Sequence, residues 1–204
     1  DRIEEALKQY LDLAELYRQM AEIDSARTTL DQAYKLSQRS TVSREWTLKT
    51  LDMMGDIDLS RLDLRQALQI FEDICEIDPQ NEKARSHMID LNLRLGQEDQ
   101  AAIALDIHLD HLVQSDHAQE ALTLLEDLAR EYPGKQALHS RLAGAYRAAG
   151  RTADAIAQYD ALGEIQLDAG QTKEAIKTIQ TIVDLDPPNI EGYHDLLRNL
   201  HDSA

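Results

Sequence analysis

The segment 150–176, GRTADAIAQYDALGEIQLDAGQTKEAI, contains the pattern Gly-x4-Ala twice, at 150–155 and at 170–175. The two occurrences are twenty residues apart, whereas helix-hairpin repeats space such a pattern by about 34 residues. Because a glycine of this kind ends a helix at positive φ, each occurrence indicates a hairpin turn. We therefore predict one helix, at about residues 152–169, that is shared by two hairpins.

A longer repeat surrounds this segment. Moving the sequence along itself by 54 residues brings three stretches into register without a gap. Equivalent positions share an alanine (67, 121 and 175) and a proline (79, 133 and 187). The three stretches are LDMMGDIDLSRLDLRQALQIFEDICEIDPQN (51–81), LDIHLDHLVQSDHAQEALTLLEDLAREYPGK (105–135) and YDALGEIQLDAGQTKEAIKTIQTIVDLDPPN (159–189).

Apolar residues within each copy recur at intervals of three and four, which is typical of amphipathic helices. The 54-residue unit therefore corresponds to three helices, and the predicted fold is an all-α, right-handed α-solenoid of about eleven antiparallel helices. We expect one domain over 1–204, with sub-units 1–42, 43–80, 81–134 and 135–188 and a C-terminal helix at 189–204. The expected helices are 2–20, 23–38, 43–59, 62–77, 81–95, 98–114, 117–131, 135–149, 152–169, 172–185 and 189–201.

Three sets of residues resemble the tetratricopeptide repeat (TPR) family, in which a helix pair carries small residues, a tyrosine, a turn glycine and a late proline. The resemblance implies that the first helix of each pair lines a concave groove that binds a peptide or a partner helix. It implies groove positions at Lys8, Leu11, Glu15 and Arg18, and then at Lys49, Asp52 and Asp56. The sets are Leu142, Ala143, Tyr146, Gly150, Ala155 and Tyr159; Leu13, Ala14, Tyr17, Ala26 and Leu30; and Leu162, Gly163, Gly170, Ala175 and Pro187. Repeat spacings of both 41 and 54 residues leave open which helices line the groove.

The charge of the chain bears on its partners. Lys and Arg number 21 against 38 Asp and Glu, a formal net charge of −17. A field of this sign repels phosphate backbones and anionic lipid headgroups, so we expect neither nucleic acid nor membrane as a partner. A single cysteine, Cys75, excludes an intrachain disulfide and suits a cytoplasmic location. The sequence begins in a predicted helix without Met, so we expect a fragment of a longer protein.

His108 and His111 are the weak candidates for a metal site, because they lie three residues apart on one predicted helical face. A metal would need further ligands. The repeat places aliphatic residues at the equivalent positions, so packing imidazoles are the favoured interpretation, with a pH-sensitive element as an alternative.

No catalytic motif is present in the sequence: it has no Gly-rich phosphate loop, G-x-S-x-G or H-E-x-x-H. The carboxylate pairs Asp56–Asp58 and Glu126–Asp127 are expected on solvent-facing positions, and Cys75 is expected to be a buried small apolar side chain. We predict a protein that is not an enzyme and uses no cofactor.

One predicted helix has the opposite charge to the rest of the chain. The stretch KQALHSRLAGAYRAAGR (135–151) holds five basic residues, counting histidine, and no acid. Ser140, Gly144 and Arg147 share one face, with Arg141 nearby, so this surface is a candidate site for an acidic peptide or a carboxylate. Alternatively, its arginines only neutralise neighbouring acidic helices.

Three hypotheses for function follow. The first is a non-catalytic scaffold that binds a peptide or partner segment in a groove. The second is self-association through the last helix, which exposes Leu196, Leu197 and Leu200. The third is a ligand- or peptide-sensing domain of a larger regulator.

Overall fold

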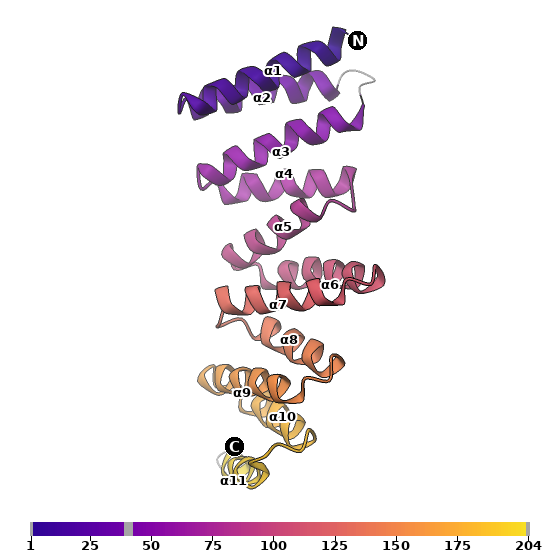
Figure 1. Cartoon of the computed structure of the whole chain (residues 1–204). Coiled ribbons are helices and arrows are strands. Elements are labelled where there is room, and N and C mark those ends of the chain that lie inside the picture. The colour runs from indigo at the N-terminus through magenta and orange to yellow at the C-terminus, as the bar shows by residue number, and fades with distance from the viewer. Residues whose placement is uncertain (1, 39–42, 203–204) are drawn as a thin grey trace. The chain divides into compact units, whose positions relative to one another are not determined.

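The computed structural model describes residues 2–38 and 43–202, which form eleven α-helices and no strand (Figure 1). Every helix lies within two residues of its expected bounds. The all-α prediction is therefore confirmed. The helices are α1 (Arg2–Gln19), α2 (Ile23–Gln38), α3 (Arg44–Ser60), α4 (Leu64–Ile77), α5 (Glu82–Arg94), α6 (Glu98–Gln114), α7 (Ala118–Glu131), α8 (Gln136–Ala148), α9 (Thr152–Asp168), α10 (Thr172–Val183) and α11 (Ile190–Asp202).

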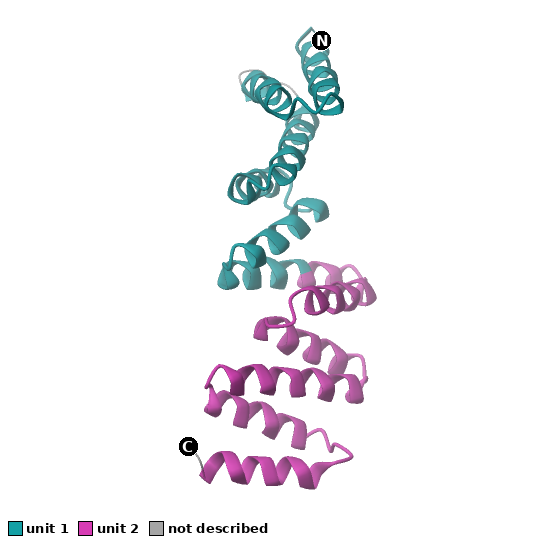
Figure 2. Ribbon diagram, turned by 90° about the vertical axis from the view of Figure 1, so that its left-hand side faces the viewer, with its two compact units in different colours: residues 1–108 teal, residues 109–204 magenta. Residues whose placement is uncertain are grey.

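The chain divides into two compact units, Asp1–His108 and Leu109–Ala204, and α6 passes through the boundary (Figure 2). Each unit contains a run of helices, α1–α5 and α7–α11, in which neighbours in the sequence pack on one another. The expected single domain over 1–204 stays a prediction.

Unit 1 packs α1 on α2, α2 on α3, α3 on α4 and α4 on α5. Its core is made of fully buried side chains such as Leu30, Leu51, Phe71 and Leu91. The Phe71 ring lies against Gly55, where an added Cβ would stand only 2.8 Å from the ring Cζ atom. Only glycine at this position lets α3 and α4 approach so closely.

Unit 2 packs α7 on α8, α8 on α9, α9 on α10 and α10 on α11. Helix α9 therefore packs on the helix before it and on the helix after it. This arrangement confirms the shared helix that the two Gly-x4-Ala patterns predict. The shared alanines Ala155 and Ala175 are both fully buried, as close helix contacts require.

The backbone angles of the hairpin turns explain why the sequence marked some turns and not others. Gly150 has φ +72°, and the amide of Arg151 donates to the carbonyl of Tyr146 at 2.8 Å, which closes the end of α8. Leu62 and Asp116 adopt the same positive φ without being glycine. The turns after α3 and α6 therefore lack the glycine that marks the turns after α5, α8 and α9.

Candidate partner-binding surface

The groove expected in unit 1 draws on α1 and α3. Lys8 is exposed, but Leu11 is only 3% exposed and packs in the core, so the prediction that it lines a groove is wrong. Its side chain fills the contact of α1 with its neighbours and cannot reach a partner. Glu15 and Arg18 line, with Asp56, a hollow of about 310 Å³.

The charges of this face are paired with one another. Arg18 Nη2 lies 2.7 Å from Glu15 Oε1, and the hydrogen bond with Arg18 lowers the pKa of Glu15 below its ordinary value. Lys83 Nζ lies 2.7 Å from Asp52 Oδ1 and 3.1 Å from Asp56 Oδ1.

Lys83 was missed by the sequence analysis. It lies on α5, and no spacing rule joins it to aspartates that precede it by 31 and 27 residues. Another expected cation, Lys49, lies over the Trp46 ring with its amine 5.8 Å from the ring centroid. The carboxylates expected in the unit 1 groove therefore have counter-ions within the chain.

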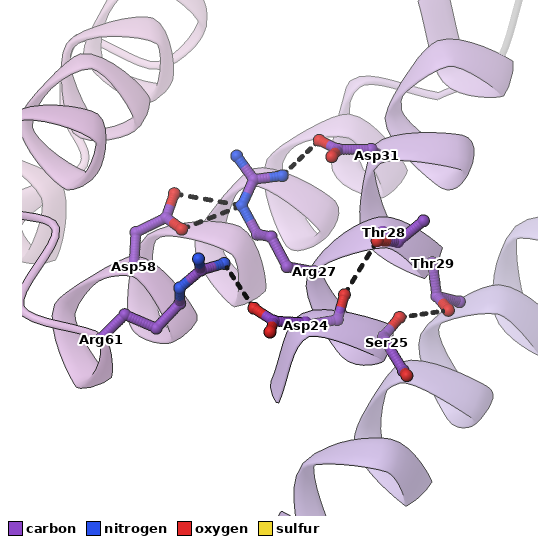
Figure 3. A network of polar contacts seen from close by, with 8 residues as sticks. All are labelled: Asp24, Ser25, Arg27, Thr28, Thr29, Asp31, Asp58 and Arg61. Carbon is purple, nitrogen blue, oxygen red and sulfur yellow. Dashed lines mark hydrogen bonds and ion pairs between the residues drawn. The ribbon is translucent and has the colours of Figure 1, made fainter. Parts of the chain in front are cut away.

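Asp58 does not lie where the sequence placed it. It was expected on a solvent-facing position beside Asp56, but it is 2% exposed, and its carboxylate accepts from Arg27 Nε at 2.9 and 3.2 Å (Figure 3). Arg27 also contacts Asp31, one turn further along α2. The expectation for Asp58 was wrong because the partly buried guanidinium of Arg27, on α2, compensates its charge.

Two opposing effects act on this carboxyl. Burial raises the pKa of Asp58 above its ordinary value, and the Arg27 guanidinium counteracts that shift. The position equivalent to Asp58 in the other copies is held by Leu112 and Gln166, and both are buried. The 54-residue register therefore indicated a buried position at Asp58. The charged residues beside Asp58 in the sequence had suggested an exposed position instead.

In unit 2, α8 carries the basic surface that the sequence predicted. Ser140, Gly144 and Arg147 are all exposed on it, and α8 contains no acidic residue. Arg147 Nη1 lies 3.4 Å from the hydroxyl of Tyr159 on α9, which holds the arginine at the surface. These three residues form the exposed face of α8.

The other basic groups of this stretch differ in position. His139 is buried, and its ring nitrogens lie 2.9 Å from Gln158 Oε1 and 2.8 Å from the carbonyl of Pro133. Arg151, just beyond α8, lies 2.7 Å from Asp154 Oδ2 and 3.3 Å from Glu126 Oε1. His139 and Arg151 are therefore structural, and neutralisation of neighbouring acids accounts for Arg151.

An apolar hollow of about 380 Å³ adjoins the exposed face of α8, and Arg141, also on α8, lies in its wall. Arg141 is half-buried and donates to the carbonyl of Ala137 at 3.1 Å. The hollow combines aliphatic walls with one guanidinium, a mixture that suits recognition of an apolar group with acidic neighbours. Its lining residues are Leu109, Val113, Ala118, Gln119, Ala121, Leu122, Leu125, Arg141, Ala145, Ala148 and Ala149.

The histidine and cysteine candidates lie in packed positions. His108 is buried and His111 half-buried, in keeping with packing imidazoles. Within residues 2–38 and 43–202, no group of three or more His, Cys, Asp or Glu side chains is arranged to hold a metal ion. Cys75 is half-buried against the unit 1 core, and burial raises the pKa of its thiol.

The last helix is more exposed than its neighbours. None of the described residues of α11 is buried, and Leu196 is 37% exposed, with Leu197 and Leu200 half-buried beside it. Across the described part of the chain, every helix is too short or too polar to span a bilayer.

Comparison with known proteins adds the following. Three family models described as tetratricopeptide repeat match residues 4–80, 112–166 and 159–189. The search of curated proteins found no match.

Several solved structures are similar to this chain. YrrB, a TPR protein with an unusual peptide-binding site, is 16% identical, with 82% of this chain and 94% of that chain covered and a TM-score of 0.44. The MamA protein is 15% identical, with coverages of 98% and 90% and a TM-score of 0.48. A tetratricopeptide repeat protein from Parabacteroides merdae is 15% identical, with coverages of 96% and 84% and a TM-score of 0.45.

Proposed function

Because the chain belongs to the tetratricopeptide repeat family, we propose that it is a non-catalytic scaffold that binds a segment of another protein on α8 of unit 2. Repeats of this family are interaction modules whose helices present side chains to a partner. The proposal goes further by choosing a surface, the exposed face of α8, and a partner with acidic character.

One observation carries this choice. The chain has a formal net charge of −17, yet α8 exposes Arg147 and contains no acidic residue. An isolated basic face on an acidic molecule attracts an acidic partner segment, whereas the acidic remainder of the molecule repels that segment. By contrast, Glu15 and Arg18 of unit 1 pair with each other, and Asp52 and Asp56 pair with Lys83.

The test is an affinity capture with wild-type protein and the Arg147→Glu variant, followed by mass spectrometry. Reversing the charge of an exposed arginine at such a contact should reduce recovery of the partner by about tenfold or more. Since Arg147 is exposed, the melting temperature should not fall.

Arg198→Glu is the matched control, because it makes the same charge change on an exposed arginine of α11. Equal recovery of the same partners by wild type and both variants would refute the assignment to α8. Loss of recovery with both variants would attribute binding to overall charge instead, which also contradicts the proposal.

Self-association is a second candidate, favoured by the absence of buried side chains from the described part of α11 and by its exposed Leu196. An apolar flank of this kind would dock on another copy. Solution mass measured over a range of concentrations tests it, and a strict monomer at high concentration would count against it.

A further inference from the structure

The origin of the apolar hollow between α7 and α8 can be found by comparing its lining residues with the equivalent residues of the internal repeat. Its volume of about 380 Å³ is within the range of sites that hold small ligands or large side chains, roughly 300–1,000 Å³. Moving back by 54 residues gives, for each lining residue, the equivalent residue of unit 1. Unit 1 thus shows which side chains fill the same position in a closed core.

Three leucines of unit 1 correspond to alanines of unit 2. Leu91 is fully buried, and Leu64 and Leu95 pack against the same core. Their equivalents are Ala145, Ala118 and Ala149, all of which line the hollow. Each change from leucine to alanine removes three carbon atoms from the contact between the two helices.

A fourth change is compensated and leaves no space. Phe71 of unit 1 lies against Gly55, with an added Cβ at residue 55 only 2.8 Å from the ring. In unit 2 the pair becomes Leu125 and Leu109, so a smaller side chain on one helix meets a larger one on the other. Volume is conserved at this pair and lost at the three alanines.

Protein interiors pack densely, and unfilled apolar volume costs stability. An apolar hollow that opens beside an exposed basic face is explained if a partner supplies the missing volume. We propose that the hollow takes one bulky aliphatic or aromatic side chain of a partner segment, with acidic residues beside that side chain facing α8. This inference rests on the proposed function and names the recognition chemistry of the same surface.

The charge of α8 indicates which residues should flank the anchoring side chain in the partner segment. Arg141 lies in the wall of the hollow, and Arg147 is on the exposed face of the same helix. Because α8 has no acid, a partner with Asp or Glu near the anchor gains attraction here, and a basic partner gains none. The expected occupant is therefore an acidic protein segment with a leucine, isoleucine, methionine or phenylalanine anchor.

The experiment selects peptides from a random displayed library on the full chain. Affinities of selected peptides are then measured by fluorescence anisotropy for wild type and for Ala145→Leu/Ala149→Leu, which restores the unit 1 residues. We expect acidic peptides with a large apolar residue and a loss of affinity of about 10- to 100-fold in the filled variant, from the burial of one such side chain. Ala157→Leu, on the exposed surface of α9, should bind as wild type does.

A second filled variant tests whether a loss of binding in the first comes from misfolding instead of from filling the hollow. Ala118→Leu fills the hollow from α7, and replacing the anchor of the peptide by serine should weaken binding to wild type to a similar degree. Peptides with basic flanks, or peptides unaffected by both filled variants, would overturn the inference. If those peptides still lose affinity for Arg147→Glu, the proposed function survives, whereas a library that yields no binding peptide contradicts both.

Discussion

At the scale of single residues, Asp58 and Arg27 show how a buried charge is kept. Asp58 is 2% exposed, and both of its oxygens accept from one guanidinium nitrogen. A buried ion pair adds little when compared with apolar side chains of similar size, but breaking it leaves a charge uncompensated. Removing one partner alone should therefore destabilise the fold much more than replacing both partners by apolar side chains.

This dependence predicts a non-additive result. Asp58→Ala should lower the free energy of unfolding by about 3–5 kcal/mol, whereas Arg27→Met/Asp58→Leu should recover most of that loss. Urea denaturation followed by circular dichroism measures both. Glu15→Ala, which breaks the exposed pair with Arg18, is the control and should change stability little. Equal losses in the single and double variants would show that Arg27 does not compensate Asp58.

At the same scale, Leu11 and Lys83 mark the limits of sequence reasoning. A TPR helix presents its residues to the groove or to the core according to its rotation, and Leu11 lies on the core side. Lys83 reaches Asp52 and Asp56 across a turn and a helix, and such a contact depends on how α3, α4 and α5 pack. Neither could be read from a linear pattern.

At the scale of helices, the sequence predicted far more. All eleven helices and the sharing of α9 by two hairpins follow from apolar periodicity and from the repeat of Ala155 and Ala175. The exposed face of α8 was likewise expected from Ser140, Gly144 and Arg147. The hollow was not expected, because it depends on small residues such as Ala118 and Ala145 lining it from two different helices.

Helix α11 makes a polar contact with α9 in addition to its packing on α10. None of its described residues is buried, but the Tyr193 hydroxyl donates to the Asp160 carboxylate of α9, at 2.9 Å and 3.0 Å from its two oxygens. Burial and this hydrogen bond raise the pKa of Tyr193 to about 12. The phenol therefore keeps its proton well above the ordinary tyrosine value of about 10.

The shift predicts how the contact responds to pH. A raised pKa in the folded state gives stability that is complete below about pH 10 and is lost as pH rises towards about 12. The difference in free energy of unfolding between wild type and Tyr193→Phe should therefore be about 1–2 kcal/mol at neutral pH and should shrink in strongly alkaline solution. Urea titrations at several pH values measure it, and a difference that is constant or grows with pH would contradict the contact.

At the scale of the whole molecule, the residues that stabilise the fold and those proposed to bind a partner are largely different. Stability comes from helices that each pack on the next within a unit, which approximates a sum of neighbouring contacts. Binding, as proposed, comes from a small region where one helix departs from the acidic charge of the chain and where three alanines leave apolar volume open. Changes at α8 can therefore alter binding with little effect on folding.

Hydrogen–deuterium exchange of the full chain, with and without a selected acidic peptide, tests the assignment of partner binding to α8 most directly. Added peptide should slow amide exchange over α7 and α8, residues 118–148, while exchange in α1 and α3 stays unchanged. Protection that appears in α1 and α3 and leaves 118–148 unaffected would contradict it.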